Sequence, residues 1–227
     1  MKALDGLSFQ VNEGEIYGLL GPNGAGKTTA LRIIATLLKA DSGSVRALGA
    51  DISLDPRAFR QNLAFLSSDL KLDEFFSPAY HFDFFSALRD IPKERARERR
   101  EQLFERFGIS SYAHKKLHSL SAGMKQKAAF VVSIAHDPPI ILFDEPTNGM
   151  DLLSARTVKD FLLELKDRGK TIILSTHLFG LAEGVCDSLG FIVDGKMLHS
   201  GSLGELTQGQ TLESAFFSLY DKQGARE

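Results

Sequence analysis

The chain has 227 residues, of which 43% are apolar and 25% charged, and this composition predicts a globular protein with a full hydrophobic core rather than a disordered chain. The net charge of −2 argues against a general nucleic-acid-binding surface, and no apolar run reaches the roughly 18–20 residues that a membrane-spanning helix needs. We expect no signal peptide at Met1, and Cys186, the only cysteine, excludes an internal disulfide and fits a reducing, cytosolic compartment.

The first predicted elements are two strands and a helix. Leu7, Phe9 and Val11 alternate with polar residues, which indicates a half-buried strand. Residues 16–20 form a short apolar run that is typical of a buried parallel strand, and residues 28–38 have the pattern of a helix. A glycine-rich loop therefore connects the end of a buried strand to the start of a helix.

This loop fits the phosphate-binding pattern G-x-x-x-x-G-K-[ST]. Its glycines let backbone N–H groups close around phosphate oxygens, and the following helix directs its positive end at the anion. Lys27 would reach the β- and γ-phosphates of a nucleotide, and the Thr28 hydroxyl would bind Mg²⁺. The alternative is a chance glycine turn, which would produce the pattern in roughly one chain in a hundred of this length. The predicted nucleotide-binding residues are Gly21, Pro22, Asn23, Gly24, Ala25, Gly26, Lys27, Thr28 and Thr29.

The middle of the chain contains two segments with different hydrophobic patterns. Residues 44–66 contain short alternating segments around Gly49 and Pro56, and residues 70–135 have a helical pattern with a solvated charged run at 93–100. Six aromatic residues crowd the start of the helical part, and they could form the core of that part. They cannot all face inward from one amphipathic helix, so some of them could instead line a groove for a partner helix. They are Phe75, Phe76, Tyr80, Phe82, Phe84 and Phe85.

Two acids follow the next apolar strand, residues 140–143. Ligands of open parallel sheets bind at the carboxyl ends of the strands, so Asp144 would face the Mg²⁺ held by Thr28. Glu145 would lie beside the γ-phosphate and polarise an attacking water. The alternative, a strand followed by solvated acids, is common when no phosphate loop precedes it.

Strands and helices alternate through the rest of the chain. We predict a helix over residues 154–168 that Gly169 stops, a strand at 171–174, a helix at 178–185 and a strand at 191–193. Residues 203–227 have weak helical periodicity and a polar end. The whole order indicates an α/β core with a parallel sheet and a helical lobe inserted into it.

Three further segments resemble motifs of the ATP-binding-cassette (ABC) family. Leu120-Ser121-Ala122-Gly123-Met124-Lys125-Gln126 is similar to the signature segment Leu-Ser-Gly-Gly-Gln. Asp144-Glu145-Pro146-Thr147-Asn148-Gly149-Met150-Asp151 resembles the metal-binding strand end with its D-loop, and Ser175-Thr176-His177 resembles the switch histidine. The resemblance extends from about Leu4 to Gly201, and it is strongest to ATP-binding subunits of exporter-type (sodium-exporter-like, ABC-2 type) transporters.

The resemblance implies one ABC nucleotide-binding domain over residues 1–227. Its fold would be a P-loop NTPase core with a parallel sheet, a small antiparallel β region and an inserted helical subdomain. The core would cover about 1–66 and 137–200, the helical subdomain about 70–135, and a C-terminal tail about 201–227. The cofactors implied are ATP and Mg²⁺.

The resemblance also assigns residues to a site shared by two copies. Ser121 and the Gly123 backbone would contact the γ-phosphate of a nucleotide bound by the partner copy, and Asp151 would belong to the shared site through the D-loop. His177 would contact the γ-phosphate in its own copy and act with Glu145 in catalysis. An ordinary helix N-cap is the other role for Ser121, and the two roles are compatible.

Two positions depart from the family pattern. Ser68 stands where the family usually has a glutamine that touches Mg²⁺ and the water, and a serine is too short to span that gap. The family also has a strand and an aromatic residue upstream of the segment at Ala3–Phe9, and the aromatic ring stacks on adenine. The chain as given has no residue there, so we expect phosphate-dominated binding with similar use of ATP and GTP.

The predicted function is ATP hydrolysis that powers a membrane transporter, with export as the expected direction. The predicted partners are a second nucleotide-binding subunit, as a homodimer, and a separate transmembrane permease, with no nucleic acid. The location would be cytoplasmic, at the cytoplasmic face of the membrane through that permease. The alternative is a soluble ABC-type ATPase that remodels a ribosome or a nucleic-acid complex, although the usual second cassette, coiled coil or basic tail is not visible. A small-molecule kinase would leave the signature segment unexplained.

Overall fold

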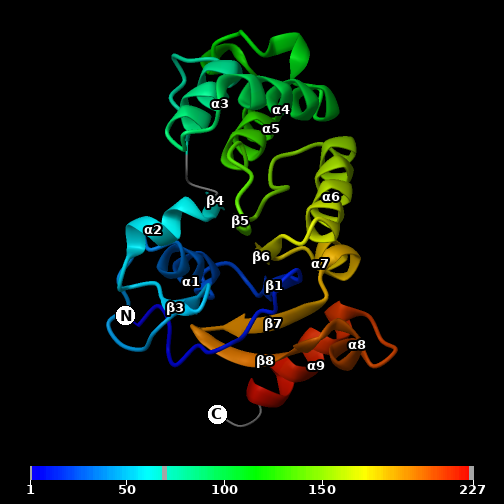
Figure 1. The fold of residues 1–227 in the computed structure, drawn as a ribbon. Coiled ribbons are helices and arrows are strands. Elements are labelled where there is room, and N and C mark those ends of the chain that lie inside the picture. The colour runs from blue at the N-terminus through cyan, green and yellow to red at the C-terminus, as the bar shows by residue number, and fades with distance from the viewer. Residues whose placement is uncertain (1, 68–70, 225–227) are drawn as a thin grey trace.

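The computed structural model of the chain describes residues 2–67 and 71–224. Its main element is a six-stranded sheet in the order β4-β5-β6-β1-β7-β8, stacked from β4 beside the helices of the upper part to β8 at the lower end (Figure 1). All neighbouring pairs are parallel except β7–β8. The strands are β1 (Ile16–Leu20), β4 (Leu63–Leu66), β5 (Ile140–Asp144), β6 (Thr171–Thr176), β7 (Ser188–Val193) and β8 (Lys196–Ser202).

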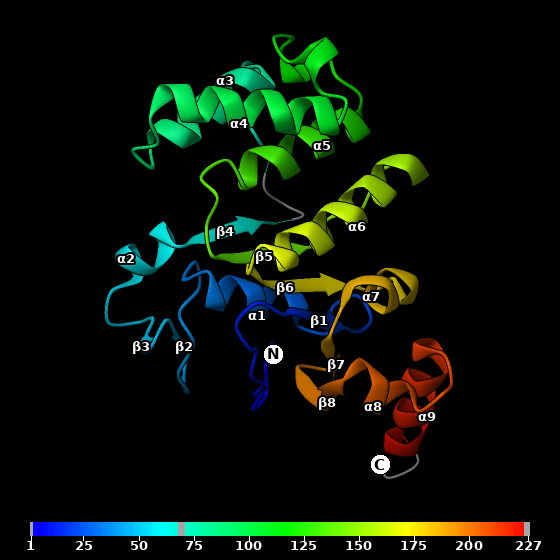
Figure 2. The ribbon, with the colours of Figure 1, turned by 45° about the vertical axis from the view of Figure 1, so that its right-hand side comes forward.

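Apolar side chains on both faces of this sheet are buried, which explains why its strands read as continuous apolar runs. One face packs on α1 (Lys27–Ile34) and α2 (Pro56–Gln61). The other face packs on α5 (Ala122–Ser133), α6 (Leu152–Asp167), α7 (Phe179–Val185) and the C-terminal helices α8 (Leu203–Thr207) and α9 (Leu212–Gly224). Figure 2 shows α6 and α7 along one side of the strands.

A helical region is inserted between β4 and β5. It consists of α3 (Pro78–Ala87), α4 (Lys93–Arg106) and α5, with two 3₁₀ turns at Ser110–Tyr112 and Leu117–Ser119. A separate two-stranded antiparallel sheet, β2 (Arg46–Ala47) with β3 (Ala50–Asp51), precedes α2. The predicted combination of a parallel sheet, a small antiparallel region and an inserted helical part is therefore confirmed.

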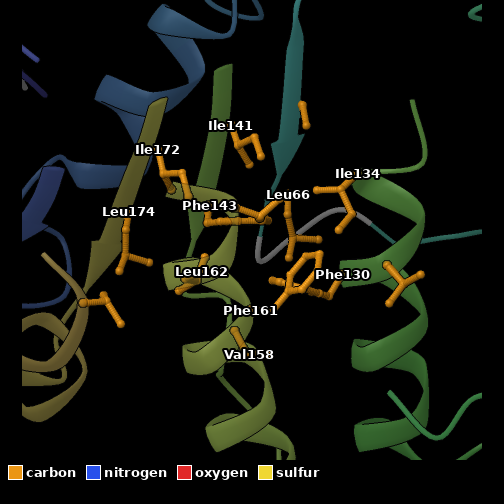
Figure 3. Packing of buried hydrophobic residues seen from close by; sticks show 14 of the residues in the cluster. Leu66, Phe130, Ile134, Ile141, Phe143, Val158, Phe161, Leu162, Ile172 and Leu174 are labelled. Atoms are coloured by element: carbon orange, nitrogen blue, oxygen red, sulfur yellow. The ribbon is translucent and has the colours of Figure 1, made fainter. Parts of the chain in front are cut away.

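The helical region and the sheet share one hydrophobic core. Phe130 of α5 stacks on Phe143 of β5 with ring centroids 4.9 Å apart, and Phe161 of α6 meets Phe130 edge-on (Figure 3). The guanidinium of Arg106 on α4 lies 4.7 Å from the centre of the Phe161 ring. These contacts fix the position of α5, and therefore of the segment that precedes it, relative to the end of β5.

The predicted strand around residues 7–11 is wrong. Leu7, Phe9 and Val11 pack against the buried cluster on the α1 face, so their alternation correctly reports one-sided burial. No strand is described between residues 2 and 15, because an extended segment becomes a strand only when a neighbouring backbone pairs with it. The segment instead lies against that cluster from outside, with Phe9 stacked on Tyr17 at 5.0 Å between ring centroids.

Other elements differ from the prediction in extent. The first helix ends at Ile34, and Thr36 just after it has a left-handed φ of 59°. Strand β8 was not predicted, because its residues are polar and exposed on the edge of the sheet. Ser68 lies outside the described residues. Within the described part of the chain, every helix is too short or too polar to cross a membrane.

Candidate active site

The phosphate loop lies between β1 and α1, as the sequence predicts. Gly24 and Gly26 have φ values of 82° and 104°, a conformation that is strained for residues with a Cβ atom. Gly21 is constrained differently, because a Cβ atom there would lie 2.0 Å from the carbonyl oxygen of Ile192. The loop therefore needs glycine for its own shape at two positions and for close packing on β7 at a third.

Lys27 begins α1 and only 6% of its surface is exposed. Its Nζ atom donates hydrogen bonds to the carbonyl oxygens of Gly21 at 2.7 Å and Pro22 at 3.0 Å. It also lies 3.9 Å from Oε1 of Glu145. Burial lowers the pKa of Lys27, and the carboxylates of Glu145 and Asp144 oppose that shift. The ammonium group is therefore held inside the loop, where it can meet an anionic ligand.

Asp144 and Thr28 come together although 116 residues separate them. The Thr28 hydroxyl donates to the Asp144 carboxylate at 2.9 and 3.1 Å. The Ser175 hydroxyl donates to the same carboxylate, because Ser175 of β6 is the register partner of Asp144 in β5. Asp144 is fully buried, so these contacts compensate for its loss of hydration.

Glu145 follows β5 in a left-handed conformation with a φ of 52°. Its backbone N–H donates to the Ser175 carbonyl oxygen at 3.0 Å. Its side chain is 13% exposed and accepts a hydrogen bond from Nδ1 of His177 at 2.9 Å. A non-glycine residue with positive φ at a strand end is uncommon, and here it turns the carboxylate toward Lys27 and His177.

These side chains surround a cleft of about 520 Å³. Of the predicted site residues, Asn23, Gly24, Gly26, Lys27, Thr28, Thr29, Glu145 and His177 line it. Asp144 lies just beneath, bonded to Thr28. Gly21, Pro22 and Ala25 shape the loop without lining the cleft. A buried strand end, a phosphate loop and a carboxylate–histidine pair thus converge on one space large enough for a nucleotide.

Ser121, Gly123 and Asp151 do not line this cleft. Ser121 is exposed and caps α5, where it accepts the Met124 N–H at 3.3 Å. Asp151 caps α6 and accepts hydrogen bonds from both the backbone and the hydroxyl of Ser154. The Ser154 hydroxyl, followed by the Ser154 backbone N–H, lowers the pKa of Asp151. Within one copy, these three residues are therefore separate from the phosphate loop.

Gly195, which was not predicted as a site residue, joins three segments at the cleft. Its N–H donates to the Ala25 carbonyl oxygen at 2.9 Å, and its carbonyl oxygen accepts the Asp5 N–H at 2.8 Å. It has a φ of 76°, and a Cβ atom there would lie 2.6 Å from the Ala3 carbonyl oxygen. The Asp194-Gly195 turn was the only sequence signal. Asn148, Lys2 and Ala3 also line the cleft and were not predicted.

Comparisons with known proteins agree with this site. The family model described as ABC transporter matches residues 4–148. The chain is 34% identical to the ABC transporter ATP-binding protein NatA of Bacillus subtilis over 223 residues, which cover 98% of this chain and 91% of the relative. It is 33% identical to the daunorubicin/doxorubicin resistance ATP-binding protein DrrA of Streptomyces peucetius over 226 residues, covering 100% of this chain and 68% of that protein.

Two solved structures extend the agreement to the fold. The structure of an ATP-binding subunit of an ABC transporter superposes with a TM-score of 0.90 at 27% identity, covering 96% of this chain and 93% of that one. A dimeric ATP-binding cassette bound to ADP and Pi in a post-hydrolysis state has a TM-score of 0.82 at 25% identity, with 88% and 90% covered. Motifs, cleft and relatives together place this chain in the ABC transporter family, as an ATP-binding subunit with ATPase activity.

Proposed function

We propose that this chain hydrolyses Mg²⁺-bound ATP at sites shared by two copies, and that this reaction drives export through a separate membrane subunit. The observation that carries the catalytic part is the convergence of Lys27, Glu145 and His177 on the cleft that the phosphate loop lines. The export direction is supported by the similarity to NatA and to the resistance protein DrrA.

Each cleft residue has a role in the proposed reaction. The N–H groups of the phosphate loop and Lys27 bind the phosphate oxygens. Glu145 accepts a hydrogen bond from the attacking water and thereby makes the water a stronger nucleophile. The hydrogen bond that His177 donates orients the Glu145 carboxylate. His177 is 44% exposed at its side chain, so it can also reach the γ-phosphate.

Thr28 and Asp144 fit a Mg²⁺ site. Their oxygen atoms already lie within 3.1 Å of one another, and Mg²⁺ in nucleotide sites is held by one or two protein oxygens together with phosphate oxygens and waters. When bound, the ion would neutralise charge on the β- and γ-phosphates. Asp144 is buried and stays close to its partners Thr28 and Ser175, so it would act on the ion directly or through one water.

The remaining residues are proposed to act across the dimer. Ser121 and Gly123 begin α5 at an exposed helix N-terminus, which suits an anion held by the partner copy. Asp151 would support the same interface through its loop, since Gly149 of that loop approaches Gly123. The dimeric relative bound to ADP and Pi supports this arrangement.

The domain division and location are proposed on the same basis. A core over about 1–66 and 137–200, a helical subdomain over about 70–135 and a tail over about 201–227 would form one nucleotide-binding domain. A permease would hold the subunit at the cytoplasmic face of the membrane. The net charge of −2 gives no support to the rival function, remodelling of a ribosome or nucleic-acid complex.

Phosphate release by the purified chain tests the shared site. The rate should require Mg²⁺ and should rise faster than linearly with protein concentration in the dilute range, because only dimers contain complete sites. Measurements in magnesium and in excess EDTA, from nanomolar to micromolar protein, give both dependences. A rate per chain that stays constant across that range would contradict a shared site.

The exposed aromatic cluster supports a membrane partner. Phe82 is fully buried, whereas Phe75, Phe76, Tyr80, Phe84 and Phe85 are exposed on and just before α3. Phe76 and Tyr80 stack with ring centroids 4.3 Å apart, and Tyr80 stacks on Phe84 at 6.2 Å. Phe76, Tyr80 and Phe84 thus form a contiguous aromatic column on the surface. Such a column is typical of an interaction site, and we propose that a helix of the permease docks there.

Phe76→Ser and Tyr80→Ser should therefore weaken membrane recruitment and change folding stability little. Phe82→Ala is the matched control, because removing a buried aromatic side chain costs about 3–5 kcal/mol of stability. Chemical denaturation gives the stability, and co-sedimentation with membranes that contain the permease gives the recruitment. A loss of several kcal/mol in Phe76→Ser or Tyr80→Ser, with recruitment unchanged, would assign the column to core packing.

A further inference from the structure

A second cavity of about 140 Å³ lies between the sheet and the helical region, away from the nucleotide cleft. Its walls come from the edge strand β4, from the end of α3 and from α5. Most of the lining is apolar, including Ala64, Leu72, Phe85 and Val132. An apolar cavity of about this size accommodates one benzene-sized group, so it has room for a single side chain of a partner.

Arg89 is the only cationic side chain that lines this cavity among the described residues. It is half-buried, and burial lowers the pKa of its guanidinium, with the nearby Arg60 adding to that effect. Among the described residues, no carboxylate forms an ion pair with Arg89. Partial burial beside a second cation disfavours the charge on Arg89, and an incoming anion would offset that cost.

His136, which also lines the cavity, does not add a second positive charge to it. Its Nε2 atom donates to the Leu63 carbonyl oxygen of β4 at 3.1 Å. Burial is the main cause that lowers the pKa of His136 to about 4, so its ring is neutral near pH 7. The polar lining of the cavity therefore consists of the Arg89 guanidinium, the neutral His136 ring that is already hydrogen-bonded to β4, and Ser133, whose hydroxyl already donates to the Phe130 carbonyl oxygen.

The cavity is continuous with the exposed aromatic column. Phe85 lines the cavity and is also exposed, and its ring meets the Phe84 ring of the column edge-on with centroids 5.4 Å apart. It lies four residues before Arg89, which follows the end of α3 at Ala87. A helix that packs its apolar face on the column could therefore place one side chain in the cavity. The basic cavity wall selects the charge of that side chain, because charge complementarity favours a carboxylate and disfavours a second cation.

We propose that Arg89 is a specificity-determining residue for the membrane subunit, and that the cavity receives a glutamate or aspartate side chain from the docking helix. The carboxylate pairs with the Arg89 guanidinium while the apolar part of the helix covers Phe85 and its neighbours. This inference rests on the proposed membrane partner and names the chemistry that recognises it.

A matched pair of synthetic amphipathic helical peptides tests the charge requirement. The two peptides are identical except for glutamate or glutamine at the centre of the apolar face, and each is titrated into the isotope-labelled full chain by NMR. The glutamate peptide should bind about tenfold or more tightly than the glutamine peptide, since hydrogen bonds to charged groups are the stronger class. Equal affinities, or no binding of either peptide at millimolar concentration, would overturn the proposal.

The variant Arg89→Met should remove the preference for the glutamate peptide, and Arg89→Lys should retain part of it. Arg97→Met is the control, because Arg97 is an exposed arginine of α4 that pairs with Glu101 and does not line the cavity. It should keep the full preference. Thermal unfolding of each variant shows whether the fold is kept, and Arg89→Lys keeps the positive charge if Arg89→Met is unstable.

ATP hydrolysis separates this inference from the proposed function. Arg89 does not line the nucleotide cleft, so Arg89→Met should keep the ATPase rate of the free chain. A wild-type chain without ATPase activity would contradict the proposed function. Normal activity with no charge preference would contradict only the role of Arg89. If Arg89→Met instead abolishes dimer formation in gel filtration, the occupant is a second copy and the proposal fails.

Discussion

Replacing Glu145 by glutamine is expected to lower the rate of ATP hydrolysis by about 10²–10⁴-fold, the usual contribution of a positioned general base. Glutamine has nearly the same shape, and its amide oxygen can still accept the hydrogen bond that His177 donates to Glu145. It cannot take a proton from water. The variant therefore keeps the geometry of the site and loses its base.

Nucleotide binding should survive in the same variant. The Glu145 carboxylate lies 3.9 Å from Nζ of Lys27 and competes with phosphate for that ammonium group. Removing the negative charge leaves Lys27 free to bind phosphate oxygens. ATP should then remain bound, and the ATP-bound dimer should accumulate because hydrolysis no longer separates it.

Single-turnover phosphate release measures the rate of the Glu145→Gln variant, and gel filtration after incubation with ATP measures the dimer. Glu94→Gln, on the exposed first turn of α4, is the control and should behave as wild type. A Glu145→Gln variant with near-normal turnover would show that another group activates the water.

Mixing two inactive variants, Lys27→Ala and Ser121→Arg, is expected to restore ATPase activity. Lys27→Ala removes the ammonium group of the phosphate loop, and the loss of a charge-assisted hydrogen bond should weaken ATP binding by about 10–150-fold. Ser121→Arg places a long cation at the N-terminus of α5, where a phosphate held by the partner would approach. Each variant alone should have little ATPase activity.

The mixed dimer differs from both parents. One of its two sites combines the altered loop of the first chain with the altered signature segment of the second, so it is inactive. The other site combines the intact loop with the intact signature segment, and it should work. A one-to-one mixture should therefore recover up to one active site per mixed dimer, measured as phosphate release that rises with mixing.

The control for this experiment is a mixture of two loop variants, Lys27→Ala with Thr28→Ala, in which no dimer contains an intact site. It should stay inactive at every ratio. If the mixture of Lys27→Ala and Ser121→Arg also stays inactive, while each protein is folded and the wild type is active, Ser121 does not act on the partner's nucleotide.

The sequence predicts the parts of the site that lie close together along the chain. Residues 21–29 form a local motif in which the backbone N–H groups and the Lys27 side chain surround one site. The loop can therefore be recognised from the sequence without a structure. Asp144 and Glu145 can be recognised for a related reason, because they follow a buried apolar strand and ligands bind at the carboxyl ends of such strands. The same local logic correctly placed Ser121 at a helix N-terminus.

The sequence is ambiguous where one pattern has two physical causes. The alternation of Leu7, Phe9 and Val11 records burial on one side, and it cannot show that no neighbouring backbone pairs with the segment. The aromatic residues from Phe75 to Phe85 likewise allowed either a core or a surface. Only packing decides between them, and it buries Phe82 while leaving the others exposed.

The sequence predicted that Asp144 faces Thr28 and that His177 acts with Glu145, but only the tertiary structure set the distances between these residues. Glu145 and His177 are 32 residues apart, and the parallel register of β5 and β6 brings their side chains to 2.9 Å. Gly195 joins the N-terminal segment to the phosphate loop, and Arg89 faces a cavity whose other walls come from β4 and α5. Local patterns specify which elements form, whereas side-chain packing between elements sets their register, and register determines the distances on which binding and catalysis depend.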